Sequence, residues 1–129
     1  MQYSLLDRHA EETCFQLLQQ HNIGVLARGS VASGLLVDKP AKTYLNYNED
    51  QVKNAAAAIK DFSGAHRSLA QTAIQFVLRH PAVTSAVVGL RTSEQLEDAV
   101  KTTSVTKLTE AEIEQLQKSI ERNFYEEHR

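Results

Sequence analysis

The stretch "SAVVGLRTSEQLEDA", residues 85–99, passes from a strand pattern through a glycine into a helix pattern. Small and β-branched residues predict a buried strand that ends at Gly89, and Thr92 then begins an acidic helix. The first N–H groups of a helix are unpaired and its dipole is positive there, so a phosphate fits at this point, and Arg91 can add a charged contact. The alternative is that Thr92 is simply a helix cap, with Gln95 completing a capping box and Arg91 in solvent.

Strand and helix patterns alternate along the rest of the chain. The sequence predicts strands at 2–6, 23–30 and 83–89, and helices at 7–22, 49–62, 69–80, 92–102 and 110–124. Ser68 with Gln71, and Thr109 with Glu112, predict capping boxes at the starts of two of these helices. This alternation is typical of an α/β fold with parallel strands and right-handed crossovers. We therefore predict a single unit over residues 1–129, with three parallel strands, flanking helices and a frayed tail at 125–129. Such a sheet leaves one face and two edges open, so it is expected to belong to a larger sheet or barrel, or to self-associate.

Composition is that of an ordinary globular protein, with 42% apolar and 23% charged residues. The formal net charge of −2 gives no general attraction to nucleic acid or to an anionic membrane. No apolar run approaches the roughly 18 residues of a membrane span. Cys14 is the single cysteine, which excludes an internal disulfide and favours the reducing cytoplasm as the location.

A second candidate loop, "ARGSVASGLL" at residues 27–36, follows the predicted strand at 23–30. Gly29, Ser30, Ser33 and Gly34 make this loop flexible and rich in hydroxyl groups. In parallel α/β sheets and barrels, ligands bind at the carboxyl ends of the strands. An ordinary turn is the alternative, but two strand ends of the same character favour one shared ligand.

Several motifs together resemble the C-terminal half of a bacterial aldo-keto reductase. The matching stretches are "YSLLDRHAEE", "IGVLARGSVASGLL", "SLAQTAIQFVLRHPAVTSAVVGLRTSEQLEDAV" and "LTEAEIEQL". The resemblance covers nearly the whole chain and is weakest in a variable loop region at 38–64. It implies the C-terminal portion of a (β/α)8 TIM barrel, with its sixth, seventh and eighth strands at the three predicted positions.

The resemblance also implies a site for NADPH, the cofactor with which this family reduces carbonyls to alcohols. The loop after the seventh strand would hold the pyrophosphate, partly through backbone groups, and the segment after the eighth strand would hold the phosphate on the adenosine ribose and the adenine. The implied cofactor-binding residues are Arg28, Gly29, Val31, Ser33, Gly34, Leu35, Lys39, Gly89, Arg91, Thr92, Gln95 and Asp98. Two positions depart from the family pattern: Arg28 replaces an aromatic residue that stacks on the nicotinamide in many members, and Ala99 replaces an asparagine.

The family's catalytic Asp, Tyr, Lys and His lie on strands that precede the matched region. None of Tyr3, Tyr44, Tyr47 and Tyr125 corresponds to the catalytic tyrosine. The resemblance therefore implies an NADPH-dependent oxidoreductase in its complete form, to which this chain contributes the cofactor-binding part and no catalytic residue. The alternatives are a non-enzymatic, self-associating half-barrel or a nucleotide- or phosphate-binding module. The expected partner is a second copy in a homo-oligomer, with a dimer favoured, or the N-terminal half of the barrel.

Overall fold

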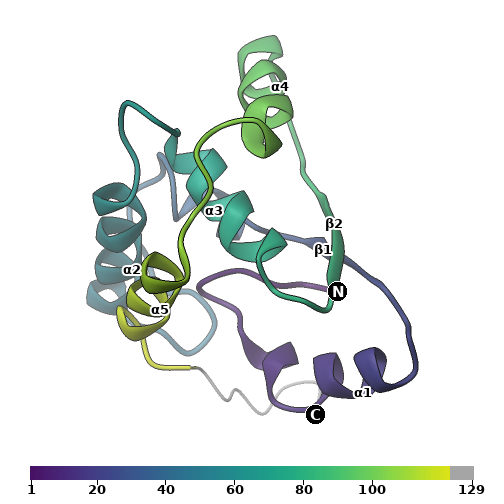
Figure 1. Ribbon diagram of the computed structural model, residues 1–129. Helices are drawn as coiled ribbons and strands as arrows, with labels where there is room; N and C mark the ends of the chain where they lie inside the picture. Colours follow the sequence, from purple (N-terminus) through teal and green to yellow (C-terminus); the bar gives the residue numbers. More distant parts are fainter. Residues whose placement is uncertain (123–129) are drawn as a thin grey trace.

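Two parallel strands form the sheet of this protein. The structure, a computed structural model, describes residues 1–122 (Figure 1). Strand β1 (Val25–Arg28) pairs with strand β2 (Val83–Val87), and Arg28 lies opposite Val87 at the end of the ladder. The predicted strands at 23–30 and 83–89 are thereby confirmed, although both are shorter than expected. The predicted tail at 125–129 lies outside the described residues.

The third predicted strand, at residues 2–6, is wrong. The N-terminal segment runs parallel to β1 and forms one bridge, between Gln2 and Arg28, supported by a bond from the Tyr3 N–H to the Arg28 carbonyl (3.0 Å). The chain then reverses in a tight turn, where Ser4 and Asp7 bond to each other through their backbones. The apolar residues that suggested a strand lie in this turn, where their side chains fill the core.

Five α-helices accompany the strands in the described part of the chain. They are α1 (Cys14–Gln20), α2 (Glu49–Asp61), α3 (Leu69–Leu78), α4 (Ser93–Val100) and α5 (Glu110–Lys118). The helix predicted at 7–22 is divided into a short 3-10 turn at His9–Glu11 and α1. Full capping boxes begin α2, α3 and α5, with Ser68 and Gln71 bonded reciprocally at α3 and Thr109 and Glu112 at α5, as predicted for those two. Helix α5 ends at Lys118, earlier than predicted.

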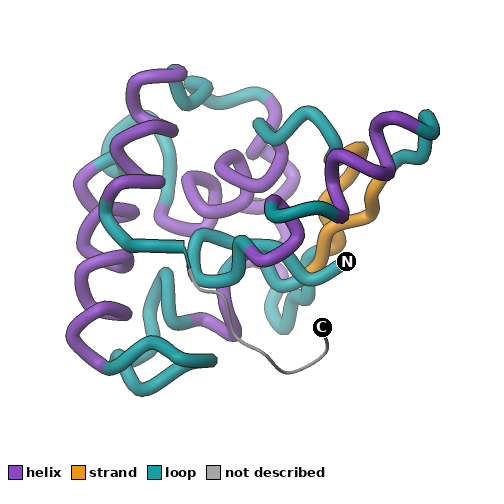
Figure 2. Tube along the Cα trace, turned by 90° about the horizontal axis from the view of Figure 1, so that it is seen from below, coloured by secondary structure: helices purple, strands orange, loops and turns teal. Residues whose placement is uncertain are grey.

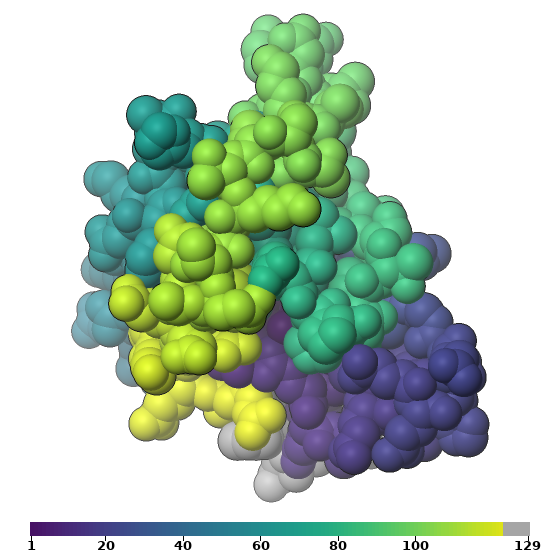
Figure 3. All heavy atoms as spheres, in the orientation of Figure 1, coloured from purple at the N-terminus to yellow at the C-terminus, as the bar shows by residue number. Residues whose placement is uncertain are grey.

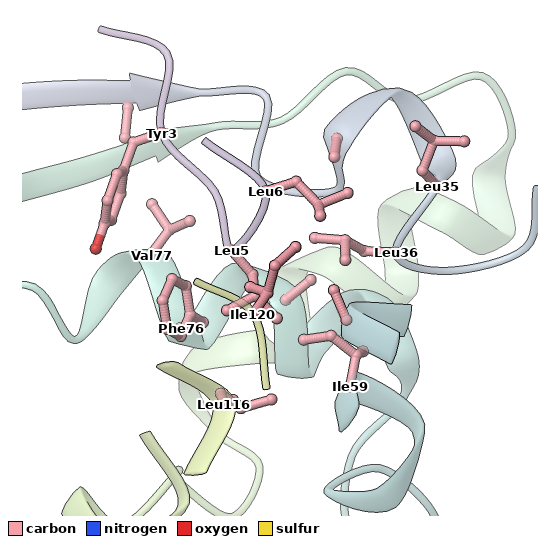
Figure 4. Packing of buried hydrophobic residues seen from close by; sticks show 14 of the residues in the cluster. Tyr3, Leu5, Leu6, Leu35, Leu36, Ile59, Phe76, Val77, Leu116 and Ile120 are labelled. Carbon is pink, nitrogen blue, oxygen red and sulfur yellow. The ribbon is translucent and has the colours of Figure 1, made fainter. Parts of the chain in front are cut away.

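The core lies on one side of the sheet and is centred on α3. Residues 71–77 of α3 are all buried, and Figure 4 shows Phe76 and Val77 packed beside Tyr3 and Leu5. Leu116 and Ile120 close the same cluster from the C-terminal end. Figure 2 shows that the bulk of the helical chain lies to one side of the two strands. No helix within residues 1–122 is long and apolar enough to cross a membrane.

The opposite face of the sheet is open. Along β1, Val25 and Ala27 are buried whereas Leu26 is 62% exposed, and on β2 Val87 is 54% exposed. None of the eight residues of α4 is buried, and the space-filling view shows this helix standing out from the body of the molecule (Figure 3). The expectation of an uncovered sheet face is therefore confirmed.

A buried polar network ties the N-terminal segment to α5. The Tyr3 hydroxyl donates to Glu11 (2.6 Å), Arg8 makes two bonds to the same carboxylate, and Arg8 also donates to the Gln117 carbonyl. Burial opposes ionisation of Glu11, but the hydrogen bonds from Arg8 and Tyr3 outweigh it and lower the Glu11 pKa. His80 packs against the Tyr3 ring, and its burial lowers the His80 pKa.

The free energy of unfolding should decrease as the pH falls from about 7.5 to about 5.5. Because the pKa of His80 is lowered in the folded state, the unfolded chain takes up this proton first as the pH passes the ordinary histidine value. The stabilisation is thus present above that value and is lost below it. Urea unfolding across this range should show a shallower pH dependence for His80→Gln than for the wild type. The exposed His21 supplies a control, and His21→Gln should keep the wild-type dependence; equal slopes for all three proteins would contradict the assignment.

Candidate functional site

The register of the two strands brings both predicted loops to one edge of the sheet. Arg28 pairs with Val87, so the loop that starts at Gly29 and the segment that leads to Gly89 leave the sheet side by side. This edge is the carboxyl end of both strands, where parallel sheets bind their ligands.

The loop that follows β1 has an unusual backbone conformation. Gly29 and Gly34 have φ angles of 79° and 94°, and Ala32 and Ser33 also have positive values, 48° and 57°. For residues with a Cβ, a left-handed conformation costs about 1 kcal/mol each, so the surrounding structure must hold it in place. Leu35 does so from inside, because its side chain is buried in the core. Strain of this kind is concentrated at ligand sites, which makes this loop the stronger of the two candidates.

Some backbone donors of this loop are used within it and some are not. The N–H groups of Gly34 and Leu35 bond to the carbonyls of Val31 and Ala32. The N–H groups of Val31 and Ser33 form no backbone hydrogen bond with any described residue. Among the backbone groups that the resemblance assigns to a pyrophosphate, the N–H groups of Val31 and Ser33 are therefore available to donate a hydrogen bond.

Lys39 lies over the turn at Gly34. The Lys39 N–H donates to the Gly34 carbonyl (3.1 Å), and a Cβ added to Gly34 would lie 3.0 Å from the Lys39 side chain. A larger residue at position 34 would therefore displace the lysine. Lys39 thus lies against the loop, and its implied role in holding a pyrophosphate stays a prediction.

The segment that leads into α4 is a helix cap with an additional bond. The Thr92 hydroxyl accepts from the Gln95 N–H (3.2 Å), as the cap predicts. The Gln95 side chain accepts from the Arg91 N–H (2.8 Å) rather than from Thr92, so the predicted reciprocal box is not formed. The side chains of Arg91, Thr92 and Gln95 remain exposed beyond Gly89.

Asp98 is directed toward α3. Its carboxylate accepts from the Ser68 hydroxyl (2.6 Å) and from the Gln71 side chain (3.0 Å), and Gln71 also donates to the Asp98 carbonyl. Both carboxylate oxygens thus have a partner within the fold. The implied contact of Asp98 with adenine stays a prediction, and its observed role is to attach α4 to the first turn of α3.

Three cations at this edge have no acidic partner. Arg28, Lys39 and Arg91 form no ion pair with any acidic residue in the described part of the chain, whereas Arg8 and Arg67 do. Unpaired cations beside free N–H groups attract an anion. Within residues 1–122, no group of His, Cys, Asp and Glu is arranged to hold a metal ion.

A polar cluster beside the first loop was not predicted. The Gln2 side chain packs against Gly29 and donates to Asp7 (2.8 Å) and to the Tyr44 hydroxyl (3.2 Å). Asp7 is buried. These contacts join the N-terminal segment, the strand end and the variable region at 38–64. The sequence signal for this cluster is an acidic residue, Asp7, directly after an apolar run.

The fold agrees with the comparison with known proteins. The model of the aldo/keto reductase family matches residues 1–121. This chain belongs to the aldo/keto reductase family. It is 36% identical, over its whole length, to the uncharacterized oxidoreductase YqkF of Bacillus subtilis and spans 44% of that protein. It is also 31% identical to pyridoxal 4-dehydrogenase of Microbacterium luteolum, over 76% of this chain and 30% of the relative.

Solved aldo-keto reductases contain the same fold unit. The holo form of AKR11C1 from Bacillus halodurans aligns with 100% of this chain at 36% identity and a TM-score of 0.83, and the alignment covers 43% of that structure. The glycerol dehydrogenase AKR11B4 from Gluconobacter oxydans shares the fold, with a TM-score of 0.71 over 92% of this chain and 20% identity. This aldo/keto reductase chain thus spans less than half the length of the relatives it matches.

Removal of the Asp98 carboxylate should destabilise the fold. Asp98→Ala would leave donors on Ser68 and Gln71 without their acceptor and detach α4 from α3. We expect a loss of about 1–3 kcal/mol in the free energy of unfolding, measured with urea. The neighbouring Glu97 is exposed, so Glu97→Ala is a matched control with little expected effect. Equal stabilities of the two variants would contradict this role for Asp98.

Proposed function

We propose that this chain supplies the cofactor-binding part of an NADPH-dependent oxidoreductase that reduces carbonyls to alcohols. The observation that carries the proposal is the strained loop 29–39, where the free N–H groups of Val31 and Ser33 lie in a segment bordered by Arg28 and Lys39. The second strand end adds Arg91 at the same sheet edge. Two sources of positive charge on one edge suit a ligand with two separate phosphate groups.

Different residues of the chain would bind different groups of the cofactor. The N–H groups of Val31 and Ser33, with Lys39, would hold a pyrophosphate, because unpaired amides in a positive-φ turn form an anion-binding concavity. Arg91 would hold the ribose phosphate, and the exposed Thr92 and Gln95 lie on the same helix start. Arg28 is exposed at the end of β1, where its planar guanidinium could lie against the nicotinamide ring. When bound, NADPH supplies the hydride.

The proton for the carbonyl oxygen would come from outside the described residues. The Tyr3 hydroxyl is bonded to Glu11, and burial together with the negative charge of Glu11 raises the Tyr3 pKa above its usual value. The Tyr47 hydroxyl donates to the Glu121 carbonyl, and Tyr44 lies within the Gln2 cluster. The tyrosine acid of this family, positioned by Lys and His, would thus be contributed by preceding strands of the barrel. Such a reductase would act in the cytoplasm, where Cys14 stays reduced.

Cofactor binding by the chain should be weak and should depend on Arg91. We expect Arg91→Ala to lower the affinity for NADPH, and for the fragment 2′,5′-ADP, by about 5- to 150-fold, as for the loss of a charged hydrogen bond. Isothermal titration with both ligands measures this. Lys101→Ala, a change to an exposed lysine just beyond α4, is the matched control and should have no effect.

Two results of this titration would contradict the proposal. The first is tight NADPH binding that is unchanged in Arg91→Ala, which would place the site elsewhere. The second is equal binding of inorganic phosphate and of NADPH, which would favour a phosphate-binding module.

The isolated chain should not turn over substrate. NADPH oxidation in the presence of a reactive aldehyde, followed by absorbance, should stay at the background rate because no tyrosine of the described residues is placed as the acid. Turnover by protein purified free of any complete reductase would show that the acid lies within this chain.

A further inference from the structure

A cavity lies between the last turn of α3, the 3-10 helix at Lys101–Thr103 and the segment that leads to α5 (Figure 1). Arg79 caps α3 shortly before β2 begins at Val83, so the cavity lies toward the amino end of the strand. The two candidate loops leave from the carboxyl end. The cavity has a volume of about 240 Å³, and the residues that line it are Gln75, Leu78, Arg79, Thr102, Thr103 and Lys107.

The buried Gln75 fixes one wall of the cavity. Its side-chain amide donates to the carbonyls of Thr102 (2.9 Å) and Thr106 (3.2 Å), and its side-chain oxygen accepts from the Leu108 N–H (2.8 Å). Both donors of this side chain are thus used within the fold. Gln75 therefore holds the segment 102–108 against α3 and gives the cavity its shape.

One buried hydroxyl of the lining has no partner. Thr102 is 3% exposed, and its Oγ1 forms no hydrogen bond with any described residue. A buried polar group without a partner is destabilising, and such groups in native structures usually meet water or a ligand. The Thr102 hydroxyl therefore indicates that the cavity has a polar occupant.

Two cations border the cavity, and none of its lining residues is acidic. Lys107 is exposed and forms no ion pair in the described part of the chain. Arg79 pairs with Glu110, whose side chain is 77% exposed. An ion pair as exposed as this contributes little to stability, so another carboxylate can replace Glu110. Cations beyond a helix C-terminus also offset the helix dipole, but that role does not account for the Thr102 hydroxyl.

The size of the cavity limits the occupant to a small molecule. The volume of about 240 Å³ is about eight times that of one water molecule in the liquid. This suits a molecule of about eight non-hydrogen atoms, and a dinucleotide is far too large for it. Two cations without an acidic residue in the lining favour an occupant with two negative charges.

We propose that this cavity binds a small organic dicarboxylate. One carboxylate pairs with Arg79 in place of Glu110, because a guanidinium binds a planar carboxylate through two parallel bonds. The other pairs with Lys107 and accepts from the Thr102 hydroxyl, while Leu78 contacts the carbon chain. This site goes beyond the proposed cofactor function and shares no residue with it.

The experiment is an NMR titration of the chain with succinate, at constant ionic strength and without cofactor. The amide signals of Thr102, Thr103 and Lys107 should shift together and reach saturation. Succinamide has the same length without the charges and should cause no shift. Sulfate carries two charges without two separate carboxylates and should bind about tenfold more weakly, as for the loss of a charged hydrogen bond.

Four variants test the contacts one by one. Lys107→Ala should lower the affinity for succinate by about tenfold or more, and Thr102→Val by about 2- to 10-fold, whereas Thr102→Ser keeps the hydroxyl and should keep the affinity. Thr102→Val should not lower the thermal unfolding temperature, because the hydroxyl that it removes has no partner in the free chain. Glu110→Gln should raise the affinity, since Arg79 then has no competing carboxylate.

Lys60→Ala, at an exposed lysine in the last turn of α2, is the matched control and should have no effect on succinate binding. Three outcomes overturn the inference. They are the absence of a saturable shift with succinate, which would mean that the cavity holds only water; equal binding of succinate and sulfate; and an affinity that is unchanged in Lys107→Ala or Thr102→Val. Arg91→Ala should leave succinate binding unchanged, so failure of the cofactor site and failure of this site give different results.

Discussion

The parallel pairing of β1 with β2 is the interaction on which the rest of the structure depends. Its register sets Arg28 beside Val87, and this single pair brings together two loops that lie about 60 residues apart in the sequence. The same pairing makes a surface for α3, whose central residues are all buried. A shift of one residue would turn Leu26 into the core and Ala27 outward, and would separate the two strand ends. Fold and candidate site are thus fixed by the same ladder of hydrogen bonds.

Strain and stability are divided between different parts of the molecule. The loop at 29–39 holds two non-glycine residues in left-handed conformations, and it is anchored by buried neighbours on both sides of the turn. Helices α2, α3 and α5 start with full capping boxes and pack against the core. The well-packed helices therefore provide the rigidity that the strained loop needs, as expected where backbone strain serves a ligand.

Local patterns in the sequence predicted local structure well. The capping boxes at Ser68 and Thr109 were predicted because each depends on residues three positions apart, and the two strands because their apolar runs end at glycines. The strand at 2–6 was wrong because an apolar run fits a buried turn as well as a strand. Contacts such as Gln2 with Tyr44, or Asp98 with Ser68, join residues far apart in sequence, and the spacing of residues within one helix or strand does not predict them. The positive φ angles at Ala32 and Ser33 also lacked a signal, since alanine has no preference for that conformation.

Helix α4 is bound to the protein mainly through polar bonds, since none of its residues is buried and Asp98 connects it to α3. An element of this kind opens by itself, at a free energy well below that of global unfolding. Its backbone amides should exchange with solvent through local opening, while those of α3 exchange when the whole chain unfolds. An anion held at Arg91 would oppose that opening and would therefore be felt along α4 as a gain in order, without a change of shape.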